Sequence, residues 1–298
     1  DAVYLAGKMF GARAFAPNFP DTDLAAAVRY AHLRDVLVYV TVNTLVDNRE
    51  LADLSRYLQF LYNIGADAII LQDIGVAELA RRIIPAMPLH ASTQMTIHNL
   101  AGARYLAELG FKRIILAREL SLSEIKRICE NVQAEIEVFV HGALCICYSG
   151  QCLMSSFIGG RSGNRGKCAQ PCRLSYKLLG EQGRPALAAG QAGQFLLSPK
   201  DLCTIDLLPE LIKAGVRSLK IEGRMKRAEY VAVGVETYRR AINDYRQTGA
   251  VAGKTGENGK KRMAQIFNRG FTTAYLRGKT GRLMMSDRRP NNRGVFVG

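Results

Sequence analysis

The sequence predicts an α/β fold, a TIM-like (β/α)8 barrel that lacks its first βα unit in this chain. Short β-rich runs alternate with segments whose apolar residues recur every three or four positions. The connections are short, which is typical of parallel strands covered by helices. An open doubly wound sheet often carries a glycine-rich phosphate turn after its first strand, and no such turn is visible here. The closed barrel is therefore the favoured architecture.

The elements follow one another regularly over the first two thirds of the chain. Strands are expected at residues 2–5, 36–42, 68–71, 89–92, 113–116, 136–140 and 217–221. Helices are expected at residues 23–34, 49–64, 77–84, 99–109, 122–130 and 228–245. The helix at 49–64 should bury a stripe formed by Leu51, Leu54, Leu58 and Leu61, with Gly65 ending it. Ser121 and Glu124 should form a capping box.

Seven strands are one short of eight, and the chain opens at Asp1 inside a strand-like run, so we expect that the first βα unit is missing. The helical pattern stops at the glycine-rich residues 249–259, and residues 294–298 resemble the start of a strand. These features predict a barrel domain at residues 1–247 with a cysteine-rich insert at 141–200. Residues 248–298 would then form a basic linker and the truncated beginning of a C-terminal domain.

Polar residues gather where the predicted strands end, which is where the reactive groups of such barrels lie. They are Asn43, Gln72, Asp73, Gln94, Arg118, Glu119, His141, Glu222 and Arg224. Strand ends are also polar simply because they meet water. As a set, these residues favour a binding pocket.

The insert contains four of the seven cysteines, Cys145, Cys152, Cys168 and Cys172, among many glycines. Four thiolates brought together by glycine-rich turns can ligate an iron–sulfur cluster or a zinc ion. Zinc sites usually pair cysteines two to four residues apart, which only the last two approach, so a cluster is favoured over zinc. Unligated or partly catalytic thiols remain the alternative. Cys129 is most simply a core residue, and Cys147 and Cys203 could substitute as ligands.

The charge balance favours a polyanionic partner. Forty-one Lys and Arg face 26 Asp and Glu, which gives a formal net charge of +15. In the insert, Arg161, Arg165, Lys167 and Arg173 lie in a stretch without acids and are candidates for RNA binding. A solvated basic face is the alternative. No apolar run reaches the roughly 18 residues needed to cross a bilayer, so no membrane partner is expected and a cytoplasmic location is favoured.

Motifs of common hydrolases and nucleotide-binding proteins are missing. The sequence contains neither HExxH nor GxSxG, and its two glycine–lysine segments fail the spacing of a phosphate-binding loop. His141 lies four residues before Cys145, which would allow a Cys–His pair. A thiolate that ligates iron could not also attack a peptide bond.

Three segments carry a family resemblance: EVFVHGALCICYSGQCLMS (137–155), GRSGNRGKCAQPCR (160–173) and SLKIEGRMKRAEYVA (218–232). They resemble the U32 peptidase family, the collagenase-like proteases. The resemblance implies a barrel with a [4Fe–4S] cluster in several members, whose ligands fall on Cys145, Cys152, Cys168 and Cys172. It also implies that the activity is often hydroxylation of a ribosomal RNA base, the wobble uridine of transfer RNA or a ubiquinone precursor. The RNA-modifying branches are linked to prephenate.

These observations together predict an iron–sulfur-dependent RNA hydroxylase with prephenate as a possible co-substrate. Arg118 and Arg224 are the candidates for clamping its carboxylate, although either could pair internally with Glu119 or Glu222. Glu222 and His141 are the expected proton-handling groups, although His141 could be only structural. A collagenase-like protease and a non-catalytic iron–sulfur RNA-binding module are the alternatives.

Overall fold

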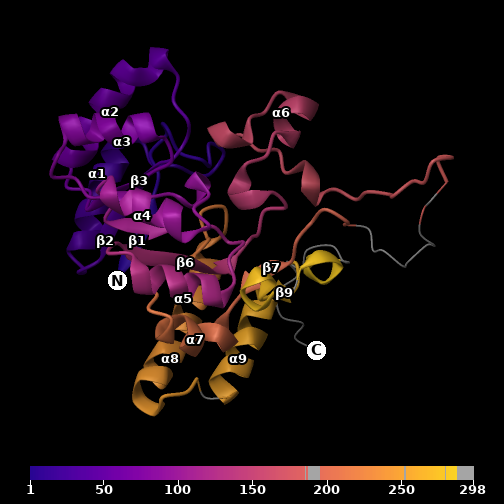
Figure 1. Cartoon of the computed structure of the whole chain (residues 1–298). Helices are drawn as coiled ribbons and strands as arrows, with labels where there is room; N and C mark the ends of the chain where they lie inside the picture. Colours follow the sequence, from indigo (N-terminus) through magenta and orange to yellow (C-terminus); the bar gives the residue numbers. More distant parts are fainter. Residues whose placement is uncertain (185, 187–194, 252, 279, 287–298) are drawn as a thin grey trace. The chain divides into compact units, whose positions relative to one another are not determined.

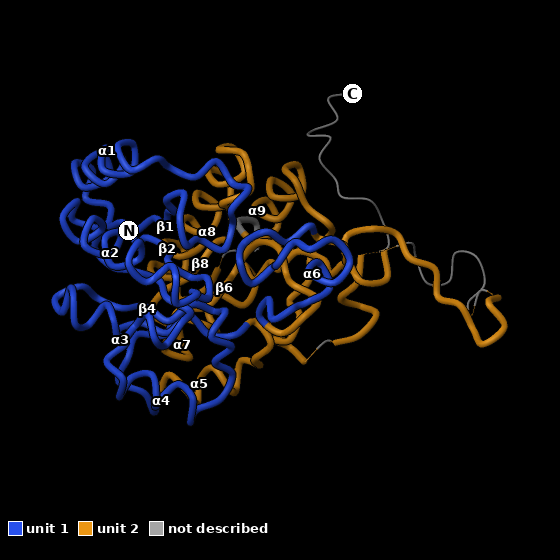
Figure 2. The backbone as a smooth tube through the Cα atoms, turned by 90° about the horizontal axis from the view of Figure 1, so that it is seen from above, with its two compact units in different colours: residues 1–117, 131–136, 149–169 blue, residues 118–130, 137–148, 170–298 orange. Residues whose placement is uncertain are grey.

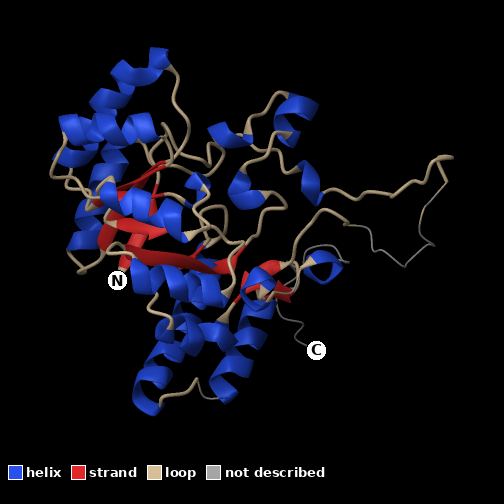
Figure 3. Cartoon of the chain, viewed as in Figure 1, coloured by secondary structure: helices blue, strands red, loops and turns tan. Residues whose placement is uncertain are grey.

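A computed structural model describes residues 1–184, 186, 195–251, 253–278 and 280–286. It confirms an α/β fold in which helices alternate with strands that are mostly parallel (Figures 1 and 3). The chain divides into two compact units (Figure 2). Unit 1 comprises residues 1–117, 131–136 and 149–169, and unit 2 comprises residues 118–130, 137–148 and 170–298.

Unit 1 contains a parallel sheet whose strands pair in chain order. These are β1 (Ala2–Leu5), β2 (Leu37–Val42), β3 (Ala68–Leu71), β4 (Leu89–Ala91) and β5 (Arg113–Ile115). They alternate with α1 (Asp21–His32), α2 (Leu51–Asn63), α3 (Ile74–Ile83) and α4 (Leu100–Glu108), and the insert adds α6 (Met154–Gly159). All four residues of β3 are buried, as expected of a parallel strand that is covered on both faces.

Helix α2 shows how the pattern of leucines positions these elements. Leu54, Leu58 and Leu61 are fully buried, as predicted, and Gly65 ends the helix with a φ of +78°. The prediction for Leu51 was wrong, because its side chain is 41% exposed. Leu51 opens the helix, and Tyr57 completes the buried stripe instead.

Unit 2 is built on β6 (Glu135–Gly142), most of which belongs to it. β8 (Ser218–Ile221) runs parallel to β6, whereas β7 (Asp201–Cys203) is antiparallel to it. β9 (Phe271–Thr272) pairs with β7. Its helices are α5 (Leu122–Asn131), α7 (Leu208–Lys213), α8 (Ala228–Thr248) and α9 (Gly253–Gln265). The capping box of Ser121 and Glu124 is confirmed, since each main-chain amide donates to the other side chain.

The prediction that regular structure stops in the glycine-rich residues 249–259 was wrong, because α9 begins at Gly253. Gly259 lies against α8, and a Cβ atom there would lie 2.6 Å from Thr237 Cγ2 and 3.2 Å from Ile205 Cδ1. Glycine therefore permits the close packing of α9, although it weakens the helical signal in the sequence.

β7 and β9 were not predicted, because three and two residues are too short to show a periodic pattern. The strand expected at 294–298 lies outside the described residues. Closure into a barrel and a missing first unit stay predictions. In the part of the chain that the structure describes, no helix is long and apolar enough to cross a membrane.

Candidate active site

The ends of β6 and β8 bring two predicted site residues together in unit 2. The main-chain amide of Glu222 donates to the carbonyl of His141 at 3.0 Å. Between them, Gly142 has a φ of +114°, and a Cβ atom there would lie 2.9 Å from both Cβ and the carbonyl oxygen of Glu222. Glycine at position 142 is thus required for this approach.

His141 is buried among aromatic rings. Its side chain is 2% exposed, and its ring centroid lies 5.7 Å from that of Tyr230, 5.9 Å from Tyr238 and 5.8 Å from Phe271. Burial lowers the pKa of His141 to about 4, against a smaller opposite effect of Asp201. The imidazole is therefore neutral at physiological pH and can accept a proton or a hydrogen bond.

A buried ion pair, which the sequence pattern did not reveal, lies near His141. Asp201 Oδ1 accepts a hydrogen bond from Arg269 Nη1 at 2.9 Å, and the two side chains are 1% and 10% exposed. Asp201 opens β7, the short strand missing from the prediction. Since an ion pair is costly to bury, its position beside His141 suggests a functional role.

Lys226 lies in the loop that follows β8. Its Nζ is 3.1 Å from the ring centroid of Phe267 and 5.6 Å from that of Tyr230. Burial lowers the pKa of Lys226 to about 8, and Arg269 acts in the same direction. Lys226 was not predicted as a site residue. It follows Glu222 and Arg224 at the same alternate spacing, which could have identified it.

The loop is held by the first turns of α8. A Cβ atom at Gly223 would lie 2.7 Å from Val231 Cγ2, so only glycine lets the loop fold back this closely. Tyr230, on the same helix, is buried, and burial raises its pKa, with Asp201 and Glu222 contributing. Its phenol is therefore protonated, and beside His141 it can act only as a hydrogen-bond donor or acceptor.

The two arginines predicted to clamp a carboxylate also lie in unit 2. Arg118 Nη1 donates to the carbonyl of Ala143 at 2.8 Å, and its guanidinium lies 5.2 Å from the ring centroid of Phe139. Arg118 Nε is buried without a hydrogen-bond partner among the described residues. Arg224 is half-buried in the loop after β8. A carboxylate clamp by this pair stays a prediction.

Other predicted strand-end residues stabilise the local structure of unit 1. Asn43 Nδ2 donates to Gln94 Oε1 at 2.9 Å, and Asn43 Oδ1 accepts from the amide of Ala12 at 3.0 Å. The carboxylate of Asp73 caps α3 by accepting from the amides of Gly75 and Val76. These contacts give the polar side chains of Asn43, Gln94 and Asp73 a structural role at the strand ends.

The four cysteines predicted as cluster ligands are divided between the units, with Cys152 and Cys168 in unit 1 and Cys145 and Cys172 in unit 2. In unit 1, Gly163 lies between Cys152 and Cys168: a Cβ atom there would lie 3.6 Å from the carbonyl oxygen of Cys152 and 4.0 Å from Cys168 Sγ. The amide of Met154 donates to Cys152 Sγ at 3.4 Å. A hydrogen bond of this kind is typical of sulfur atoms that ligate iron.

In unit 2, the second pair lies beside Arg173. Burial lowers the pKa of this guanidinium, as does Arg269, whereas the nearby Cys172 and Cys145 act in the opposite direction. Arg173 donates to the carbonyls of Leu144 and Pro199 and to Ser198 Oγ. The predicted RNA-binding residue Arg173 is thus engaged inside the protein, where its charge would offset that of thiolate ligands.

The donor chemistry of these pairs fits an iron–sulfur cluster. Within the described residues, no group of three His, Cys, Asp or Glu side chains is arranged to hold a metal ion, so ligation stays a prediction. The other cysteines are less suited to the role. Burial raises the pKa of Cys129 to about 11, and it also raises the pKa of Cys203, which is 3% exposed. Cys147 is half-buried.

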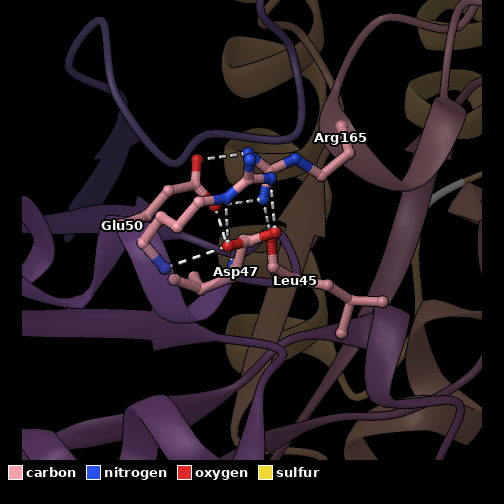
Figure 4. A pocket seen from close by; sticks show the side chains of 6 residues that line it. Leu45, Asp47, Glu50 and Arg165 are labelled. Carbon is pink, nitrogen blue, oxygen red and sulfur yellow. Dashed lines mark hydrogen bonds and ion pairs between the residues drawn. The ribbon is translucent and has the colours of Figure 1, made fainter.

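The remaining candidates for RNA binding lie in unit 1. Arg165 binds the carboxylate of Glu50 and the carbonyl of Leu45 (Figure 4). These residues line an open pocket of about 540 Å³ together with Val46, Asp47 and Arg49. Arg161 and Lys167 are exposed, and the Arg161 guanidinium lies 4.5 Å from the ring centroid of Phe15. The positive charges of Arg161 and Lys167 are therefore exposed, whereas the charge of Arg165 is paired with Glu50.

Comparisons with known proteins cover nearly the whole chain. The family model of peptidase family U32 matches residues 1–286. The 23S rRNA 5-hydroxycytidine C2501 synthase of Escherichia coli is 41% identical over 94% of this chain and 43% of its own length. The tRNA hydroxylation protein P1 of Bacillus subtilis is 40% identical over 82% of this chain and 58% of its own. A protein named collagenase from Porphyromonas gingivalis is 32% identical over 94% of this chain and 69% of its own. The chain thus spans about half the length of the first two relatives.

Proposed function

Because this chain belongs to peptidase family U32, and because its relatives include enzymes named for RNA hydroxylation, we propose that it forms part of an iron–sulfur-dependent enzyme that hydroxylates a base in ribosomal or transfer RNA. The observation that carries the proposal is the surroundings of the four predicted cysteine ligands. Cys152 with Cys168, and Cys145 with Cys172, lie in surroundings suited to sulfur ligands. These four residues would hold a [4Fe–4S] cluster, which supplies electron transfer when bound.

The positions of His141 and Glu222 in unit 2 support a reaction that needs proton transfer. His141 is neutral at physiological pH, and the main-chain amide of Glu222 donates to the carbonyl of His141. His141 would accept a proton from the target base or the co-substrate, and Glu222 would hold or return it. The surrounding rings of Tyr230, Tyr238 and Phe271 would exclude water.

The insert offers chemistry suited to an RNA strand. Arg161 and Lys167 would contact phosphates. Phe157 on α6 is 84% exposed and Phe15 is 58% exposed, and aromatic side chains on a basic surface can stack on unpaired bases. We propose that a small acidic co-substrate, prephenate, is bound near Arg118 and Arg224.

The proposal is tested by mass spectrometry of RNA nucleosides. Cells that lack the full-length protein should lose one nucleoside that is heavier than its parent by a single oxygen atom. Wild-type protein should restore it, and the Cys145→Ala and Cys168→Ala variants should not. If ribosomal and transfer RNA from the deletion strain are unchanged in every nucleoside, the proposed reaction is wrong.

A protease remains the second candidate, because one relative is named collagenase. Cleavage of gelatin by the full-length protein that persists in Cys145→Ala and in the presence of a chelator would favour it. A non-catalytic RNA-binding module is the third: RNA binding and iron would persist while all nucleosides stay unmodified.

A further inference from the structure

Two cations of unit 2 converge on one aromatic ring. Lys226 Nζ lies 3.1 Å and Arg269 Cζ lies 4.8 Å from the ring centroid of Phe267. The ring face attracts both charges, but their mutual repulsion opposes this arrangement. Arg269 is neutralised by Asp201 at 2.9 Å. Lys226 has no carboxylate within ion-pair distance in the part of the chain that the structure describes.

A third cation adds to the positive charge. Arg173, like Arg269, lowers the pKa of Lys226. The carboxylates of Asp201 and Glu222 raise it. Arg269 is bound by Asp201, and Arg173 lies beside Cys172 and donates to Ser198 Oγ, which leaves Lys226 as the cation of these three that has no anionic partner among the described residues. A half-buried ammonium group with an excess of positive neighbours is unfavourable unless an anion joins it.

The surroundings favour a small anion over an RNA phosphate. Arg269 is 10% exposed and Asp201 is 1% exposed. A site beside such buried charges suits a single carboxylate group better than a polymer backbone. The loop that carries Lys226 also carries Glu222, whose amide contacts the carbonyl of His141. A carboxylate bound by Lys226 would therefore hold the rest of a small ligand beside the two proposed proton-handling groups.

We propose that Lys226, supported by Arg269, binds a carboxylate of the small acidic co-substrate, and this assignment rests on the proposed function. The ammonium group would donate one charge-assisted hydrogen bond or more to the carboxylate. Phe267 would hold the lysine in place without competing for its protons. Because Lys226 has no carboxylate partner among the described residues, it takes the principal role in binding the co-substrate, ahead of Arg118 and Arg224.

Binding of prephenate to the full-length protein, prepared without oxygen, tests the proposal by calorimetry. Lys226→Gln should weaken binding by about tenfold or more, because a hydrogen bond to a charged group is lost. Lys226→Arg should restore part of it. Lys213→Gln, at an exposed position on α7, should leave the affinity unchanged. Equal affinity of Lys226→Gln and wild type would overturn the assignment.

A second measurement does not depend on the affinity of a variant. Acetic anhydride should acetylate Lys226 of the wild-type protein, and prephenate should protect it while Lys213 stays reactive. Protection by a transfer RNA preparation but not by prephenate would identify RNA phosphate as the anion and refute the proposal. Absence of protection by either would also refute it.

The two proposals fail in different ways. If prephenate binding depends on Lys226 but no RNA nucleoside changes in a deletion strain, the RNA reaction is wrong and the carboxylate site stands. If Lys226→Gln cells retain normal RNA hydroxylation and the purified variant binds prephenate normally, the carboxylate site is wrong and the proposed function stands.

Discussion

The carbonyl of His141 accepts a hydrogen bond from the amide of Glu222 at 3.0 Å, and Gly142 permits the contact. Two strand ends are therefore joined where the candidate proton-handling residues lie. The contact depends on a backbone conformation, φ +114°, that residues with a side chain rarely adopt.

Gly142→Ala should destabilise the protein by about 2–4 kcal/mol, because it adds backbone strain and a clash with Glu222. Gly249→Ala is the matched control. Gly249 also has a positive φ, of 73°, but a Cβ atom there would meet nothing within 4 Å. Its cost should be only about 1 kcal/mol. Urea unfolding measures both, and equal losses would contradict the proposed clash.

His141 should make the protein less stable in acid. Its pKa is about 4 in the folded protein, against 6.5 for an ordinary histidine, so the unfolded chain takes up a proton first as the pH falls. The resulting loss grows from about pH 6.5 downward and reaches roughly 3 kcal/mol below about pH 4.

The His141→Phe variant should lack this part of the pH dependence, because it keeps a ring among Tyr230, Tyr238 and Phe271 without a titrating group. Urea unfolding midpoints over the acid range measure the effect. His98→Gln, at an exposed position, should retain the wild-type slope. A slope in His141→Phe equal to that of wild type would show that other groups cause it.

The cysteine pairs should be equivalent in iron binding although they belong to different units. Cys152→Ser and Cys172→Ser, made in the full-length protein and purified without oxygen, should each lose most of the bound iron and the visible absorption of a cluster. Cys129→Ala should retain both, because its thiol is on a helix and burial raises its pKa to about 11. Iron in wild-type amounts after either pair is broken would exclude the four-cysteine cluster.

RNA binding should depend on the exposed cations of the insert. The double variant Arg161→Ala and Lys167→Ala should bind single-stranded RNA more weakly and reduce the slope of log K against log salt by about 1.4. Lys213→Ala, which removes one exposed charge outside the insert, should change neither. Filter binding at several salt concentrations measures the slopes. An unchanged slope in the double variant would assign these residues to a merely solvated face.

The sequence predicted the elements that repeat a strong pattern. The strands at 2–5 and 68–71 agree with the structure residue for residue, since each is a short run of apolar residues that fits the alternating pattern of strands and helices. β7 and β9 are too short to carry a pattern. The glycine-rich sequence of α9 resembles a linker. The need for glycine at position 259 is visible only in the structure, where Gly259 packs against Thr237.

The candidate site was predicted only where it follows a recognisable strand. His141 and Glu222 end predicted strands, and the structure brings their backbones together. Asp201 and Arg269 could not be found, because an ion pair between residues 68 positions apart leaves no local signal. Arg173 looked like one of several exposed arginines, and its hydrogen bonds to Leu144 and Ser198 depend on tertiary contacts.

Val231 sits on the first turns of α8, against Gly223, and is 38% exposed. A bulkier residue at this position would push the adjoining turn, and with it the acid and the guanidinium on either side of the glycine, without altering any reactive group. Selection or engineering could thus retune the chemistry from the outer side of a helix, leaving the reacting side chains untouched.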